Sequence, residues 1–66
     1  MQIILNGEVR QVPAGCSAAD LLASLALGER RVAMEVNLEI LPRSQYEHYR
    51  FAEGDRVEVV QAIGGG

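Results

Sequence analysis

The stretch QIILNGEVRQV, residues 2–12, decides how the fold begins. Two β-prone runs flank Asn6-Gly7, the strongest dipeptide signal for a two-residue hairpin, because both turn positions need φ > 0. The sequence therefore predicts antiparallel strands over residues 2–5 and 8–12. A proline and a glycine follow soon afterwards, and they end the second strand.

The next segment, SAADLLASLALG over residues 17–28, has the features of a short helix. Ser17 suits the N-cap, and Asp20 occupies the third position, from which a carboxylate can reach back to the cap. We predict a helix over residues 18–27, with Gly28 as its left-handed stop. One apolar stripe at helical spacing must lie on a sheet, and it comprises Ala18, Leu21, Leu22 and Leu25.

The second half of the chain alternates between apolar and polar residues, as β-structure does. Within residues 31–42, the apolar positions Val32, Met34 and Val36 predict a strand, followed by a break near Asn37 and a short strand that Pro42 ends. The polar segment that follows predicts a helical turn or a loop with aromatic residues, and a turn at residues 53–55 leads into a final strand over residues 56–61.

In the final strand, Val57 and Val59 should face the core while Val60 points outward. By the same alternation, Ile4 points outward if its two neighbours face inward. The order of elements, ββαβ(β)β, predicts an α+β domain with one helix on one face of a sheet.

The length and the composition of the chain exclude several classes of function. Sixty-six residues form a single domain, 1–66, because so short a chain cannot sustain two cores. The net charge of −3 argues against nucleic-acid binding, and no apolar run approaches the ~20 residues that span a membrane. We therefore expect a cytoplasmic protein with no nucleic-acid or membrane partner.

Side chains that could carry chemistry are few. Cys16 is the single cysteine, so an intramolecular disulfide is impossible, and with His48 it forms the one conceivable nucleophilic pair. Nothing in the sequence places these two residues together. No phosphate-binding loop, dinucleotide fingerprint or zinc spacing is present, so we expect no catalytic residue, no metal and no bound cofactor.

The stretch VVQAIGGG, residues 59–66, is the unusual feature of the chain. Three terminal glycines arise by chance in only ~3 in 10,000 chains at average glycine usage. We expect residues 62–66 to be a flexible tail, whose glycines Gly64 and Gly65 can thread a narrow slot. The carboxylate of Gly66 could attack the α-phosphate of ATP, and a thiolate or persulfide could open the acyl-adenylate. We therefore interpret the tail as a substrate for other proteins' active sites and not as a catalyst.

Several segments together resemble one family across essentially the whole chain: IILNGE, AADLLASL, VAMEVN, LPRSQYE, EGDRVEVV and the terminal IGGG. The chain resembles the ThiS family of thiamine-biosynthesis sulfur carriers. The resemblance implies the ubiquitin-like β-grasp fold, with a mixed sheet of four to five strands, one main helix packed on one face, and a flexible Gly-Gly tail.

The resemblance also implies a function as a protein co-substrate and not as an enzyme. An E1-like adenylyltransferase of the ThiF type would use ATP to adenylate Gly66. A sulfur donor protein of the cysteine desulfurase type would supply the sulfur, and thiazole synthase ThiG would use the resulting thiocarboxylate to form the thiazole ring. Gly65 and Gly66 match the functional pair of the family, and Gly64 is an additional tail glycine.

Alternatives with the same fold and glycine end stay open at this point. They are a sulfur carrier for tRNA thiolation or molybdopterin synthesis, a ubiquitin-like protein modifier, and an interaction module with an incidental tail. Whichever function applies, we expect a partner protein to dock on the sheet face away from the helix. The candidate contacts are Ile4, Val60 and Ile63.

Overall fold

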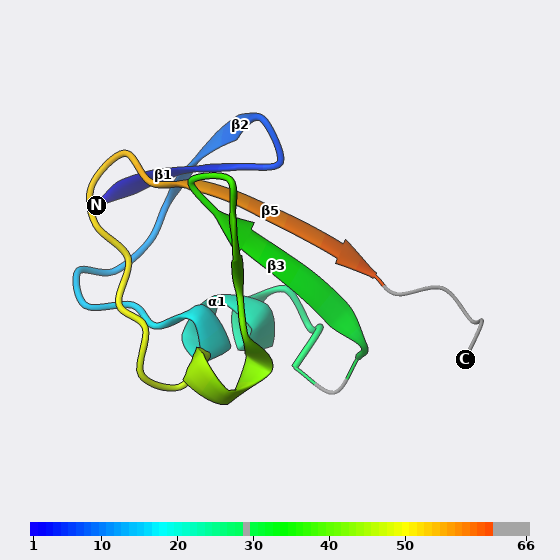
Figure 1. The fold of residues 1–66 in the computed structure, drawn as a ribbon. Helices are drawn as coiled ribbons and strands as arrows, with labels where there is room; N and C mark the ends of the chain where they lie inside the picture. Colours follow the sequence, from blue (N-terminus) through cyan, green and yellow to red (C-terminus); the bar gives the residue numbers. More distant parts are fainter. Residues whose placement is uncertain (29, 62–66) are drawn as a thin grey trace.

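The computed structural model describes residues 1–28 and 30–61, and Figure 1 shows how their elements are arranged. Residues 62–66, which include the predicted tail, lie outside the described residues. In chain order, the described elements are β1 (Gln2–Leu5), β2 (Glu8–Gln11), α1 (Ala18–Ser24), β3 (Val32–Val36), β4 (Glu39–Leu41), a short 3-10 helix η1 (Arg43–Gln45) and β5 (Arg56–Gln61).

The described strands form one mixed five-stranded sheet in the order β2-β1-β5-β3-β4. The final strand lies at its centre, parallel to β1 and antiparallel to β3. Each outer strand joins its neighbour through a two-residue turn with positive φ at both positions, Asn6-Gly7 and Asn37-Leu38. The predicted hairpin and the predicted break near Asn37 are therefore both present.

Helix α1 covers one face of this sheet (Figure 1). Its predicted stripe turns inward, because Ala18, Leu21 and Leu22 are buried and Leu25 packs against the core. The fully buried side chains Ile3, Met34 and Val57 come from three adjacent strands and meet the helix there. The mixed sheet with one helix on one face confirms the predicted fold class.

The start of α1 is as predicted. The Ser17 hydroxyl accepts a hydrogen bond from the Asp20 N–H at 3.0 Å, and the Asp20 carboxylate accepts one from the Ser17 N–H at 3.1 Å. These reciprocal bonds are a capping box, which satisfies backbone donors that the first turn leaves without partners.

The predicted end of the helix is wrong. Helix α1 stops at Ser24, and Ala26, with φ of 60°, takes the left-handed position in place of Gly28. The Leu27 N–H donates to the Leu22 carbonyl at 2.8 Å, and the Ala26 N–H donates to the Ala23 carbonyl at 3.0 Å. This is a Schellman motif, which turns Leu27 back onto the core and so ends the helix early.

Strand β2 also ends one residue earlier than predicted, although the pairing continues. The Val12 N–H donates to the Met1 carbonyl at 2.8 Å, and the Met1 amino group donates to the Val12 carbonyl at 3.0 Å. The third strand spans Val32–Val36, the residues over which alternation was predicted, and the final strand has the predicted bounds.

Candidate functional site: the open sheet face and the last strand

The two side chains considered for nucleophilic catalysis lie in different surroundings. Cys16 is buried in the loop before α1, whereas His48 is exposed. No hydrogen bond joins them in the part of the chain that the structure describes. The Cys16 thiol instead donates to the Ser17 carbonyl at 3.4 Å.

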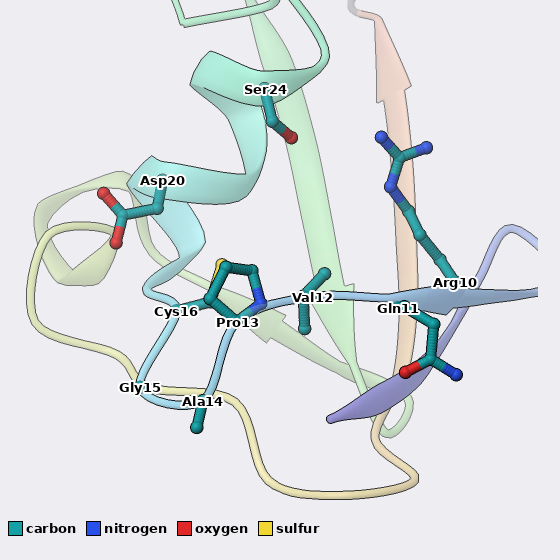
Figure 2. A pocket seen from close by; sticks show the side chains of 9 residues that line it. All are labelled: Arg10, Gln11, Val12, Pro13, Ala14, Gly15, Cys16, Asp20 and Ser24. Atoms are coloured by element: carbon teal, nitrogen blue, oxygen red, sulfur yellow. The ribbon is translucent and has the colours of Figure 1, made fainter.

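Burial and the nearby Asp20 carboxylate raise the pKa of the Cys16 thiol, although Arg50 partly opposes them. A surface pocket adjoins this thiol, and Figure 2 shows Arg10 and Ser24 among the residues that line it. Because a raised pKa keeps the thiol protonated at neutral pH, Cys16 does not have the properties of a reactive nucleophile.

Metal-ligand side chains do not gather in the described residues either. No group of three or more His, Cys, Asp or Glu side chains there could hold a metal ion. Among the same residues, no helix is long and apolar enough to cross a membrane.

The sheet face away from α1 carries exposed apolar side chains. Val60 is 63% exposed, whereas its neighbour Val59 is buried, so the two point to opposite faces as predicted. Ile4 is half-buried and pairs across the sheet with Val9 on one side and Arg56 on the other, which places it on the same face as Val60. Ile40 belongs to this face too, because it pairs with Glu35.

Charged residues occupy the middle of this open face. Glu35 and Glu58 lie directly opposite each other on β3 and β5, and Arg56 precedes Glu58 on the same face. A surface hollow adjoins them where β1 and β5 diverge, lined by Ile4, Gly7, Arg56, Val57 and Glu58. The open face therefore combines charged side chains in its middle with exposed apolar side chains that the fold itself leaves uncovered.

The last described strand is fixed in the centre of the sheet. Its Val57 carbonyl accepts a hydrogen bond at 2.9 Å from the N–H of Asn6, the residue that directly follows β1, and in the described chain the backbone pairing on this side ends there. At the next position on this side, Val59, the side chain of Asn6 provides the hydrogen bonds in place of a strand backbone. Its Oδ1 accepts from the Val59 N–H at 2.9 Å, and its Nδ2 donates to the Val59 carbonyl at 3.3 Å.

Strand β5 thus holds the chain firmly just before the segment in which we predicted the chemistry. Ile63, Gly64, Gly65 and Gly66 lie outside the described residues, so their predicted roles stay predictions. Sequence reasoning missed the bonds of Asn6 to Val59, because an Asn-Gly pair is already explained by its turn. The short length of the first strand beside a longer central one is the only signal that could have indicated them.

A model of the ThiS family matches residues 3–66. The sulfur carrier protein ThiS of Escherichia coli is 33% identical over 66 residues, and the match covers 100% of both chains. A thiazole synthase of Paramagnetospirillum magneticum is 42% identical over 66 residues, but the chain spans only 20% of that protein's length.

The fold is also similar to a solved structure. The crystal structure of a thiamine biosynthesis protein (ThiS) from Geobacter metallireducens matches with a TM-score of 0.85 and 29% identity, and the match covers 100% of both chains. Because the family model covers nearly all of the sequence and the E. coli relative covers all of it, this chain belongs to the ThiS family of thiamine-biosynthesis sulfur carriers.

Proposed function

We propose that the carboxyl group of Gly66 is the group that carries sulfur. The carboxylate oxygen attacks the α-phosphate of ATP in the active site of an E1-like adenylyltransferase, and pyrophosphate leaves. A sulfur nucleophile then attacks the acyl-adenylate, and AMP leaves. If the nucleophile is a persulfide, the product is an acyl disulfide, which a thiol must reduce before the thiocarboxylate is free.

The observation that carries this proposal is the match to the ThiS family, which runs through Gly66. The placement of β5 supports it, since a strand in the centre of the sheet gives the following segment a fixed starting point. In such an arrangement the fold positions the tail and the partner enzymes supply the catalytic groups. The buried, protonated Cys16 has no part in the proposed reaction.

We place the use of the thiocarboxylate in thiazole formation, with thiazole synthase as the acceptor enzyme. The relative from Paramagnetospirillum magneticum supports this choice, because a protein named thiazole synthase contains a region similar to this whole chain. A physical connection between carrier and synthase in one polypeptide raises their effective concentration, which suits two proteins that must meet in every reaction cycle.

Intact-mass spectrometry tests the proposal directly. After incubation with the cognate adenylyltransferase, ATP and a sulfur donor, the chain should show replacement of one oxygen by sulfur, and fragmentation should place the change at Gly66. An unchanged mass would contradict the proposal. So would normal sulfur transfer by a variant that lacks Gly66, whereas conjugates of higher mass in cell extracts would point to a protein modifier.

The open face is the proposed docking surface, with Val60 as its exposed apolar contact and Ile4 further back on the same face, where it pairs with Arg56. A Val60→Asp substitution should leave the fold intact, because the side chain is exposed, and should slow sulfur loading about 10-fold or more through a desolvated charge. Ala14→Asp, which places the same charge in the exposed loop before α1, is the matched control. Equal loading rates for both variants would remove the open face from the proposal.

A further inference from the structure

The two sides of β5 are paired to different extents. Along β3 the pairing covers positions 57–61, and alternate residues direct their backbone groups toward it. The Asn37 N–H, just beyond the end of β3, donates to the Arg56 carbonyl at 2.7 Å, so residues 56, 58 and 60 face the β3 side. The odd-numbered residues from 55 onward therefore face β1.

On the β1 side, the parallel ladder is short. The Ile4 N–H donates to the Asp55 carbonyl and the Asn6 N–H donates to the Val57 carbonyl, both at 2.9 Å. Gly7, with φ of 84°, then turns the chain away into β2. Figure 1 shows that β5 continues past this hairpin with β3 beside it.

Asn6 closes the ladder at Val59. A continuing strand would offer backbone groups to the N–H and carbonyl of Val59, and the side-chain amide of Asn6 offers the same donor and acceptor. The next residue with backbone groups on this edge is Gln61. Across residues 1–28 and 30–61, no strand or side chain pairs with that side of Gln61.

We propose that an extended segment of thiazole synthase pairs with the open edge of β5 at Gln61, next to Asn6. This inference rests on the proposed function, because it assigns the edge to the enzyme that uses the tail. Strand addition of this kind takes its affinity from backbone hydrogen bonds, and it requires an exposed sheet edge. Asn6 acts as a positioning residue. Its side-chain amide bonds both backbone groups of Val59, so Gln61 is the first described residue on this edge whose backbone groups remain available to a partner.

The open edge at Gln61 directly precedes the tail, so pairing there fixes the partner immediately before the tail. The hollow lined by Ile4, Gly7 and Glu58 lies further back, at positions 56–58 of β5. Pairing at Gln61 would therefore set the direction in which Gly66 enters the partner's active site.

Residue-resolved hydrogen exchange tests the inference on the full chain, free and in complex with the cognate thiazole synthase. The Gln61 amide should exchange rapidly in the free chain and at least about 10-fold more slowly in the complex. An unprotected Gln61 amide in a formed complex would overturn the inference. Protection that appears with the adenylyltransferase but not with the synthase would overturn the assignment of the partner, and protection that rises with the concentration of the free chain would indicate a second copy instead.

A matched pair of variants gives a second measurement. Gln61→Pro removes the free N–H, whereas Gln61→Ala removes the side chain and keeps the N–H. Since the Gln61 N–H is not used within the described sheet, both variants should fold, as amide spectra and unfolding curves can verify. Gln61→Pro should weaken binding to the synthase about 10-fold, and Gln61→Ala should bind almost as the unchanged chain does.

The two proposals fail separately. If the thiocarboxylate forms on Gly66 but Gln61→Pro and Gln61→Ala bind equally well, the strand pairing is wrong and the proposed function stands. If Gln61 becomes protected in the complex but no sulfur reaches Gly66 under any loading condition, the pairing stands and the proposed function is wrong.

Discussion

The side-chain amide of Asn37 donates to the Asp55 carboxylate at 3.1 Å, and this bond connects the β3–β4 turn to the start of β5. Asp55 is buried, and its second oxygen accepts from the Ala52 N–H at 2.9 Å and from the Tyr49 hydroxyl at 3.4 Å. One carboxylate therefore holds the turn before the central strand, the β3–β4 turn and an aromatic side chain. It fixes where the strand that leads to the tail begins.

The first prediction concerns the stability that this carboxylate provides. Asp55→Ala should lower the free energy of unfolding by about 2–3 kcal/mol, because three donors lose a charged acceptor in a partly buried place. For a domain of this size, the midpoint of thermal unfolding should fall by about 10–20 °C. Glu47→Ala, at an exposed position with no side-chain hydrogen bond in the described residues, is the control and should change the midpoint little. Equal midpoints for the two variants would contradict the assigned role.

A second prediction follows from the effect of Asp55 on its neighbour. Burial raises the pKa of the Tyr49 hydroxyl above its ordinary value of 10.0, and the charge of Asp55 and its hydrogen bond raise it further. Asp55→Asn should therefore lower the pKa of Tyr49, but only part of the way, because the effect of burial remains. NMR of the labelled Tyr49 ring across alkaline pH measures this shift.

Glu39 provides the comparison for this titration. Its charge is the smallest of the causes that raise the pKa of Tyr49, so Glu39→Gln should lower that pKa less than Asp55→Asn does. A larger effect from Glu39→Gln would show that the described contact with Asp55 does not control the titration.

Local patterns predicted those parts of the fold that local chemistry determines. The Asn6-Gly7 turn, the Ser17 cap and the final strand follow from neighbouring residues, and each is present. The predicted end of α1 was wrong, because the actual end depends on the packing of Leu27 against the core. This long-range contact favours Ala26 over Gly28 for the left-handed position. Such contacts cannot be predicted from the few residues around the end of the helix.

In the candidate site, too, the features set by local sequence were predicted and those set by long-range pairing were not. The opposite orientations of Val59 and Val60 follow from strand alternation and were predicted. The bonds of Asn6 to Val59 and the open edge at Gln61 depend on where the parallel first strand leaves the last one. That point joins residues more than fifty positions apart in the chain, so the hairpin sequence could not reveal it.

The helix cap leads to a third prediction, which depends on pH. The hydrogen bonds from the backbone and then the side chain of Ser17 lower the pKa of Asp20 below its ordinary value of 3.8. A lowered folded-state pKa means that the ionised carboxylate stabilises the fold above about pH 4, and that this contribution is lost as pH falls through the folded-state pKa. The stability difference between the unchanged chain and Asp20→Asn should therefore be constant near neutral pH and shrink below the ordinary pKa.

Urea unfolding at a series of pH values measures this difference. Ser17→Ala removes the other half of the capping box and should cost about 1 kcal/mol at neutral pH. In the Ser17→Ala background the Ser17 N–H still donates to the Asp20 carboxylate, so the effect of Asp20→Asn and its dependence on pH should persist, reduced only by loss of the weaker side-chain contribution. Complete loss of the pH dependence in that background would contradict the role of the backbone bond.

The last prediction concerns Leu38, which combines two unfavourable features. It is 84% exposed, and its φ of 70° lies in the left-handed region, which costs a residue with a Cβ roughly 1–2 kcal/mol. Its turn type favours Asn followed by Gly, so Leu38→Gly should relieve strain while losing little buried area. Because glycine also adds entropy to the unfolded chain, we expect a net gain of about 0.5 kcal/mol, or about 2–4 °C in the midpoint of thermal unfolding.

Ile40, two residues further on, separates turn strain from surface hydrophobicity. It is 76% exposed but lies within β4, where glycine weakens a strand. Ile40→Gly should therefore lower the midpoint while Leu38→Gly raises it, although both remove an exposed aliphatic side chain. If both substitutions shift the midpoint in the same direction, backbone strain at Leu38 is not what distinguishes the two positions.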